Sequence, residues 1–343
     1  MRKFLMALAI VSLIAAPAFA GGQGETEGAS GSAEPAAEQF TIKLAHIDPV
    51  THPHNLASER FAELVSERTD GNVTVQVFPA GQLGNAPNLM EQLQLGTIQM
   101  FQGGIGWWGS SVPDYWLVAS NFVFDNLEHS RAVMKGPIGD QLADQLLRDV
   151  GVRVLTQGMI RNPRNLATTE PVESLDDLQG LKVRVPEMPN WMVPWEALGA
   201  NPTPMPLTET YLGLQQGVVE GVEHGYPQLY LNNYTEVAKY VTNTRHQYEM
   251  AGFFIQGEFF QSLPAEYQDI LLEAAAEAEE HNNELQVQYR EDAKQNMTEQ
   301  GVTFIDIDTE PWYEVGREIM LEDVVPALGI TEGLLQEIWA YDY

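Results

Sequence analysis

The sequence contains no cysteine, so it can form neither a disulfide nor a thiolate metal site. Basic residues are also scarce, with 18 Lys and Arg against 48 Asp and Glu and a formal net charge of −30. A chain this acidic is a poor partner for nucleic acids and anionic membrane surfaces. Only six of the basic residues are lysines. An acid-rich, lysine-poor surface suits a salty medium, where charge repulsion is screened within about 3–10 Å, and a halophilic source is left open.

The chain also lacks a hydrophobic run long enough to cross a membrane comfortably. Its longest, "FLMALAIVSLIAAPA", follows the basic start "MRK" and precedes "AFA", which ends at Ala20. This pattern predicts a secretory signal peptide over residues 1–20, cleaved after Ala20, and a mature protein in the periplasm. Residues 21–39 contain Gly, Ser, Ala and Glu without apolar periodicity, which predicts a flexible leader.

Strand and helix patterns alternate from residue 40 onward. The patterns predict strands over 40–47, 72–79, 152–159, 180–186 and 302–308, and helices over 54–71, 130–151 and 263–301, with a helix running into a strand over 88–103. Strands that alternate with helices are typical of an α/β protein with a largely parallel sheet. The segment 263–301 has no Pro after Pro264 and no Gly before Gly301, which predicts one very long helix, with a bend near 281–283 left open.

Motifs for common enzyme chemistry are absent from the sequence. It has no G-x-S-x-G elbow, phosphate-binding P-loop, H-E-x-x-H pair or G-x-G-x-x-G opening a helix. His46, His52 and His54 cluster in "HIDPVTHPH", but their spacing matches no metal motif, and we favour structural or exposed histidines. The segment "DIDTE" lacks the glycine and the terminal glutamate of a calcium loop.

Three longer stretches resemble the DctP-type solute-binding proteins of TRAP (tripartite ATP-independent periplasmic) transporters. They are "HPHNLASERFAELVSERTDGNVTVQVFPAGQLG", "SLDDLQGLKVRVP" and "ALGANPTPMPLTETYLGLQQGVVEGVEHGYP". The similarity covers nearly all of residues 40–340 in order. The resemblance implies a two-lobed periplasmic-binding-protein-like α/β fold, with a ligand cleft between the lobes and the long helix spanning both. The lobes would be discontinuous, with residues 40–161 and about 250–289 in one and 162–249 and about 290–343 in the other.

Arg184 is the first candidate ligand-binding residue. It lies in the strand "GLKVRVP", where the resemblance implies an arginine that pairs with the ligand carboxylate. A guanidinium offers a rigid fork that fits a carboxylate with two parallel hydrogen bonds. On chemistry alone, a structural ion pair with one of the many acids is an equal alternative. A second family arginine precedes the first by about twenty residues; Arg164 has this spacing, and Arg161 is its rival.

Glu223 and His224 mark a departure from the family pattern. Many members have Asn or Trp after this glutamate, and in the Trp subtype the glutamate holds a metal ion, whereas this chain has His224. A metal ion that bridges the ligand through Glu223 stays open beside the expectation of no cofactor. Leu207 stands where some members place an aromatic ring over the ligand. Four tryptophans could cover the ligand instead, namely Trp107, Trp108, Trp191 and Trp195. Core packing is the alternative for Trp107 and Trp108. His46 and Glu187 complete the candidate ligand-binding residues.

The resemblance implies a binding protein without catalytic activity. Such a protein would hold a small organic acid, such as a hydroxy acid or a sugar acid, outside the cytoplasm. It would act as a monomer and deliver the ligand to a permease with a small and a large membrane subunit. Two alternatives are an exported α/β enzyme that uses Glu223 and His224 as an acid–base pair, and a ligand-sensing ectodomain that signals to a kinase.

Overall fold

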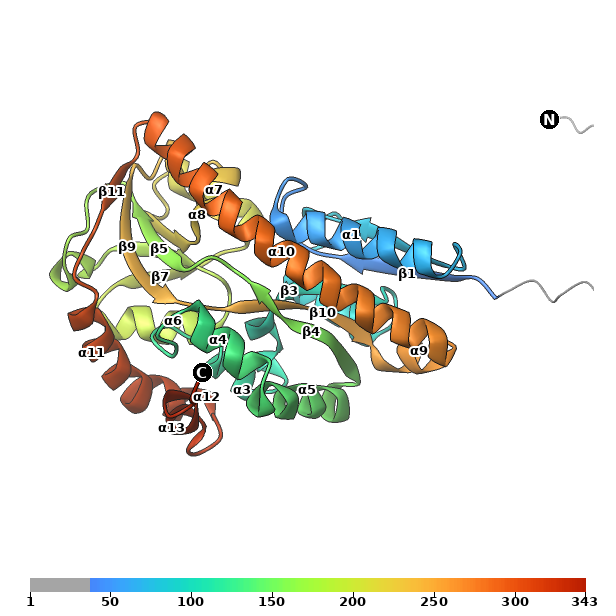
Figure 1. Cartoon of the computed structure of the whole chain (residues 1–343). Helices are drawn as coiled ribbons and strands as arrows, with labels where there is room; N and C mark the ends of the chain where they lie inside the picture. The colour runs from blue at the N-terminus through green and yellow to red at the C-terminus, as the bar shows by residue number, and fades with distance from the viewer. Residues whose placement is uncertain (1–37) are drawn as a thin grey trace, which may run out of the picture. The chain divides into compact units, whose positions relative to one another are not determined.

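The computed structural model describes residues 38–343 (Figure 1). The predicted signal peptide and all but the last two residues of the predicted leader lie outside these residues. The strands form two sheets. The first has the order β2-β1-β3-β10-β4 and consists of β1 (Phe40–Ala45), β2 (Val73–Phe78), β3 (Met100–Gly104), β4 (Val152–Ile160) and β10 (Met250–Gln256).

The second sheet has six strands in the order β11-β9-β5-β8-β6-β7. They are β5 (Arg164–Thr168), β6 (Lys182–Val185), β7 (Asn201–Pro204), β8 (Gly221–His224), β9 (Tyr240–Gln247) and β11 (Thr303–Ile305). We call the two sheets, with the helices that cover them, lobe 1 and lobe 2. The strands of lobe 1 lie within residues 40–104, 152–160 and 250–256, and those of lobe 2 lie within 164–247 and 303–305.

Both sheets are mixed, so the expectation of a largely parallel sheet is only partly met. In lobe 1, β1 is parallel to β2 and β3, but β10 is antiparallel to β3 and β4. In lobe 2, β5 is antiparallel to β8 and β9. The reason lies in the connections: β4 of lobe 1 leads through 161–163 into β5 of lobe 2, and β9 returns through 248–249 into β10. The α/β two-lobed fold is nevertheless the one expected.

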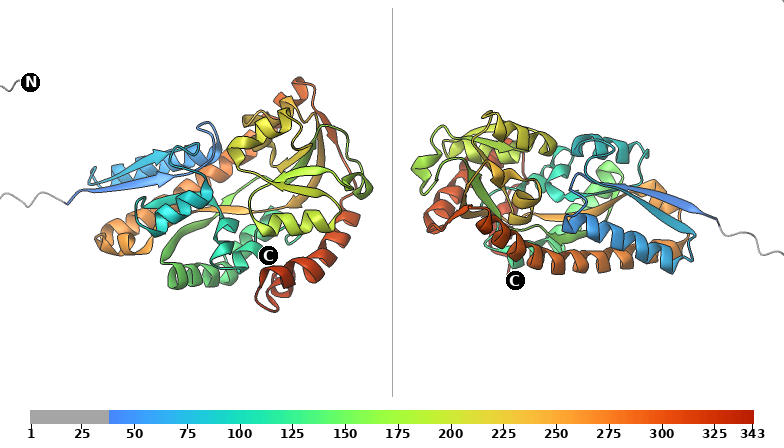
Figure 2. Two further views of the ribbon diagram at one scale, coloured as in Figure 1. Left: turned by 180° about the vertical axis from the view of Figure 1, so that it is seen from behind. Right: turned by 90° about the horizontal axis from the view of Figure 1, so that it is seen from above.

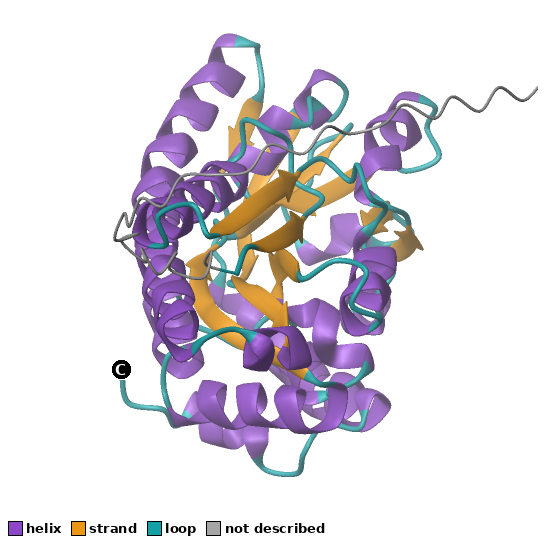
Figure 3. Cartoon of the chain, turned by 90° about the vertical axis from the view of Figure 1, so that its right-hand side faces the viewer, coloured by secondary structure: helices purple, strands orange, loops and turns teal. Residues whose placement is uncertain are grey.

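Helices enclose the strands (Figure 3). The helices before the long α10 are α1 (Pro53–Arg68), α2 (Ala86–Gln94), α3 (Asp114–Leu117), α4 (Leu127–Met134), α5 (Pro137–Val150), α6 (Pro189–Ala197), α7 (Thr210–Gln215), α8 (Tyr226–Leu231) and α9 (Gly257–Ser262). The single helix expected over 130–151 is two helices, α4 and α5. The break falls at Gly136 and Pro137, because a proline lacks the N–H that a helix interior needs and is favoured in a first turn.

Helix α10 (Ala265–Glu299) is the single long helix predicted from the uninterrupted sequence, and it joins the two lobes, as the resemblance implied (Figure 2). Its first half packs in the core of lobe 1 through Leu271 and Ala274, and its second half packs in the core of lobe 2 through Ala293 and Met297. The helix is continuous through 281–283. The polar pair Asn282 and Asn283 is buried there because their amides bond the backbone of β4 where this strand leaves lobe 1.

The C-terminal segment consists of α11 (Glu310–Ile319), α12 (Val325–Leu328) and α13 (Leu334–Trp339). It contacts α6 of lobe 2 and also returns to lobe 1. There, Thr331 bonds Asp114 in α3, and the Trp339 indole donates to the carbonyl of Val123. The predicted assignment of 290–343 to lobe 2 therefore omits this second set of contacts. No helix within residues 38–343 is long and apolar enough to cross a membrane.

Candidate functional site

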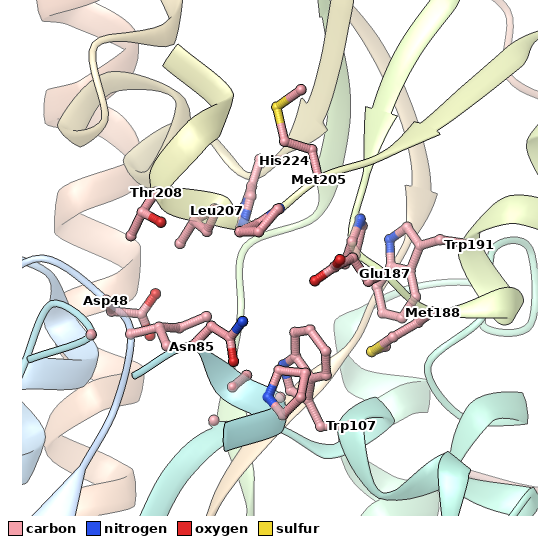
Figure 4. A pocket seen from close by; sticks show the side chains of 18 of the residues that line it. Asp48, Asn85, Trp107, Glu187, Met188, Trp191, Met205, Leu207, Thr208 and His224 are labelled. Carbon is pink, nitrogen blue, oxygen red and sulfur yellow. The ribbon is translucent and has the colours of Figure 1, made fainter. Parts of the chain in front are cut away.

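A cleft lies between the two lobes (Figure 4). It has about 950 Å³ of empty volume, part of it open to solvent. The two lobes come close to each other at the lining residues Gly81 and Thr208, since a Cβ added at Gly81 would lie 4.0 Å from Thr208 Cγ2. Charged and polar side chains from both lobes and from both crossing segments line it, namely Asp48, Asn85, Arg161, Arg164, Arg184, Glu187, Thr208, His224 and Glu249.

Arg184 lies in the cleft near the end of β6, between β7 and β8. Its side chain is buried, with a residue exposure of 3%, and both Nε (2.9 Å) and Nη2 (2.6 Å) donate to the carbonyl of Met205. Burial, with the nearby Arg164 charge, lowers its pKa from the ordinary value of 12.5. Among residues 38–343 it forms no ion pair with a carboxylate. A buried guanidinium held by a backbone carbonyl alone is suited to receive an anion from the cleft.

Arg164 also reaches the cleft, but it already has a carboxylate partner. The antiparallel pairing of β5 with β8 brings it to Glu223, whose Oε1 accepts from Arg164 Nη2 at 2.7 Å and whose Oε2 accepts from Nε. Burial raises the pKa of Glu223, but the Arg164 charge and hydrogen bonds outweigh burial and lower it to about 2. His246 lies 3.4 Å from Oε2 and completes the surroundings of this carboxylate. Glu223 therefore orients Arg164 and does not itself line the cleft.

His224 follows Glu223 on β8 and points the other way, into the cleft. Its Nδ1 accepts from the backbone N–H of Gly225 at 3.0 Å, so the neutral ring carries its proton on Nε2. Nε2 lies 3.5 Å from Arg164 Nη1, which is also a donor. Burial and the charges of Arg164, Arg161 and Arg184 hold the pKa of His224 well below 6.5. Because His224 Nε2 and Arg164 Nη1 both donate, the two groups together favour a ligand oxygen that accepts a hydrogen bond from each of them.

A second buried ion pair lies on the crossing segments and was missed in the sequence. Arg161 Nη1 lies 3.5 Å from Glu249 Oε2, and Glu249 also accepts from the N–H of Gly106. Gly104 makes room for the pair, since a Cβ there would lie 2.4 Å from Glu249 Oε1. Arg161 stood only as a rival of Arg164, and nothing in the local sequence singles out Glu249. The two residues are 88 positions apart and meet only because both crossings run side by side.

The other candidates divide into two groups. Glu187, Leu207 and Trp107 line the cleft, as does Trp191. His46, Trp108 and Trp195 are buried elsewhere, and this corrects their expected positions. Trp108 packs on Phe101 and Phe254, because neighbouring residues of the short 3₁₀ helix Ile105–Ser110 point to different sides. His46 is bonded to Asn55 Oδ1 beneath α1.

Asp48 is a further lining residue that the sequence did not reveal. It lies in the loop between β1 and α1 with His52 and His54, and one potential metal-ligand atom from each of the three lies within 4.8 Å of the others. The three side chains already form hydrogen bonds with one another and with other protein groups. His54 Nδ1 bonds Asp48 Oδ2 at 2.7 Å, and His52 Nδ1 accepts the N–H of His54 as the N-cap of α1. Gln228 of lobe 2 donates to Asp48 Oδ1 at 3.2 Å.

Buried histidines should make the stability of the protein depend on pH. Burial lowers the pKa of His46 to about 4 and of His52 to about 3, and that of His224 is also lowered. These rings stay neutral when folded but bind protons when unfolded, so their contribution is complete above pH 6.5 and is lost as the pH falls toward 4. Each such histidine lowers the free energy of unfolding by up to ~1.4 kcal/mol for each pH unit of acidification in this range. Burial raises the pKa of Glu249, which acts in the opposite direction.

Urea unfolding at pH 7.0 and pH 5.0 checks this expectation. The free energy of unfolding should be lower at pH 5.0, and His46→Asn should reduce the difference between the two values. Equal free energies at both values would show that the buried histidines do not control acid stability.

Comparison with known proteins agrees with this geometry. Residues 44–323 match the family model described as bacterial extracellular solute-binding protein, family 7. A solute-binding protein of Roseobacter denitrificans is 32% identical over 304 residues, which cover 88% of this chain and 92% of that protein. The crystal structure of this same Roseobacter protein, a TRAP periplasmic solute-binding protein with bound L-galactonate, has a TM-score of 0.82 at 30% identity and covers 89% of this chain and 100% of its own.

A second relative is a TRAP periplasmic solute-binding protein of Pseudomonas putida F1 with bound D-glucuronate. Its TM-score is 0.83 at 28% identity, with 88% of this chain and 98% of that chain covered. The match of the family model to most of the chain, together with the shared two-lobed fold, shows that the chain belongs to the family 7 bacterial extracellular solute-binding proteins, which serve transport and are not enzymes.

Proposed function

We propose that the protein binds a sugar acid, either a uronate or an aldonate, in the cleft between its lobes. The observation that carries this proposal is Arg184, a buried cation that faces the cleft without a carboxylate partner among the described residues. The ligand carboxylate would take the place of the missing counter-ion. Nε2 of His224 and Nη1 of Arg164 would donate to the same end of the ligand.

The rest of the cleft suits a polyhydroxylated carbon chain or ring. Asp48, Asn85 and Glu187 point their polar ends into it (Figure 4), and such groups exchange hydrogen bonds with hydroxyls. The indole of Trp107 lies at the same cavity and offers an apolar face for C–H groups. The relatives with bound L-galactonate and D-glucuronate support the same ligand class.

A thermal-shift screen tests this proposal. The exported protein would be used, and its mass should show that the chain begins at or near Gly21. L-Galactonate or D-glucuronate at 100 times its dissociation constant should add about 2.7 kcal/mol of stability, whereas the uncharged sugars should add little. A stabilising uncharged sugar and inactive sugar acids would contradict the role given to Arg184.

Binding should not require a metal ion. Glu223 does not line the cleft, and its charge is already paired with Arg164, so it is poorly placed to bridge a cation to a ligand there. Calorimetry with and without EDTA should give the same affinity for L-galactonate. Lost affinity that calcium restores would assign a metal to the site after all.

The partner would be a TRAP-type permease with a small and a large membrane subunit, and the protein would deliver its ligand as a monomer in the periplasm. Family membership supports this assignment. Co-purification of the exported protein with permease subunits, and a monomeric mass in light scattering, would test it. A stable dimer in light scattering would contradict the proposal that the protein acts as a monomer.

A further inference from the structure

Three guanidiniums and four carboxylates lie in and directly beside the cleft, so the charges do not cancel there. Three guanidiniums reach it, those of Arg161, Arg164 and Arg184. Two of them have their own buried partners, because Glu249 pairs with Arg161 and Glu223 pairs with Arg164. Arg184 is then the cation left for a ligand. Two further carboxylates line the cleft, and no arginine or lysine among residues 38–343 forms an ion pair with either.

Glu187 is the first of these carboxylates. It follows β6 by two residues and is exposed, and it makes no hydrogen bond or ion pair with another described side chain. Figure 4 shows its carboxylate pointing into the cavity from lobe 2. It can therefore accept hydrogen bonds from a ligand at no cost to the fold.

Asp48 is the second carboxylate and belongs to lobe 1, on the other side of the cavity (Figure 4). Burial raises its pKa, but the neighbouring His52 and His54 outweigh burial and hold the pKa well below 3.8. The residue therefore stays ionised. His54 and Gln228 each donate one hydrogen bond to it, which leaves lone pairs on both oxygens for a ligand. Arg161 also lies near enough to offset part of its charge.

We propose that Glu187 and Asp48 restrict the cleft to acids with a single negative charge. This inference rests on the proposed function and names a narrower substrate class. Arg184 receives the one carboxylate, and the two acidic side chains accept hydrogen bonds from hydroxyls of the ligand. A second carboxylate at that place would face like charges and could not donate, so an aldarate is rejected. Discrimination of this kind needs a repulsive element as well as an attractive one.

Two ligands that differ at a single carbon test the proposal. L-Galactonate ends in CH₂OH, and galactarate carries a carboxylate at the same carbon. Calorimetry on the wild-type protein should show L-galactonate binding at least about tenfold more tightly, since like charges near a protein surface repel on this scale. Glu187 is exposed, so added salt should screen its repulsion and reduce the difference in affinity between L-galactonate and galactarate. Equal or tighter binding of galactarate would overturn the proposal.

A matched pair of variants then assigns the effect. Glu187→Gln keeps the shape of the side chain and removes its charge, so the galactonate-to-galactarate affinity ratio should narrow at least about threefold, mainly through tighter galactarate binding. Glu196→Gln removes one negative charge from an exposed position on α6, outside the cleft, and should leave the affinity ratio unchanged. Asp48→Asn, checked for an unchanged melting temperature, should narrow it as Glu187→Gln does. An unaltered ratio in both cleft variants would overturn the inference. Failure of L-galactonate, galactarate and D-glucuronate alike to bind the wild-type protein would instead overturn the proposed function.

Discussion

Arg184→Lys should weaken sugar-acid binding by roughly 10- to 150-fold, although the charge is kept. An ammonium cannot form the two parallel bonds of a guanidinium, and one charge-assisted hydrogen bond contributes about 1.5–3 kcal/mol. It also cannot reproduce the paired donation of Nε and Nη2 to the carbonyl of Met205, which aims the guanidinium into the cleft. Arg184→Ala should cost more, because the ligand carboxylate would be buried without a cation. Calorimetry with L-galactonate measures both.

The melting temperature of the ligand-free protein is the necessary companion measurement. Arg184 is buried without an ion pair, so neither substitution breaks a stabilising charge pair, and the melting temperature should change little. Arg60→Lys is the matched control, since Arg60 lies on the surface of α1, with its side chain 40% exposed, and should affect neither quantity. A steep fall in the ligand-free melting temperature with unchanged affinity would make Arg184 a structural residue.

Glu223→Gln should lower the free energy of unfolding by about 3–5 kcal/mol. The substitution leaves Arg164 buried and charged beside a neutral amide, and removal of one partner from a buried ion pair has a cost of this size. Glu220→Gln is a matched control close by in sequence. Its partner is Lys182 on the surface, 3.6 Å away, and an exposed pair of this kind contributes about 0–1 kcal/mol. Urea unfolding of the three proteins measures the difference.

A double variant separates pairing from packing. Arg164→Met combined with Glu223→Leu removes both charges and keeps apolar volume, so it should recover part of the stability lost in Glu223→Gln. Stability equal to wild type in Glu223→Gln would contradict the prediction and show that the Arg164–Glu223 ion pair does not stabilise the fold.

Several features of the fold were predictable because their causes are local. Period-two alternation predicted β1 and β2, and the uninterrupted stretch after Pro264 predicted α10. The boundary at Gly136 and Pro137 was overlooked, although proline at a first helical turn is a local signal. Strand direction was harder to predict, because the antiparallel placement of β5 and β10 depends on where the chain crosses between the lobes.

In the site, the resemblance of two motifs to those of the family, one in β6 and one in β8, was enough to nominate Arg184, Glu223 and His224. The same reasoning could not tell that Glu223 turns toward Arg164 whereas His224 turns toward the cleft, since this depends on which sheet face meets the other lobe. Trp107 and Trp108 are a similar case. They are identical neighbours in sequence, and only the packing of Phe101 and Phe254 decides which one is buried.

Residues 38–343 thus carry two kinds of information. Composition, periodicity and the three long motifs were sufficient for the class of fold, the family and the arginine at the centre of the site. The pairing of Arg161 with Glu249, the position of Asp48 and the two lining carboxylates without an arginine or lysine partner among the described residues became visible only in three dimensions. The physical reason is that the electrostatic state of a charged side chain depends on the charges within a few ångströms of it. In this protein those neighbours come from segments about 60 to 180 residues apart, brought together by two strand crossings and a helix shared by both lobes.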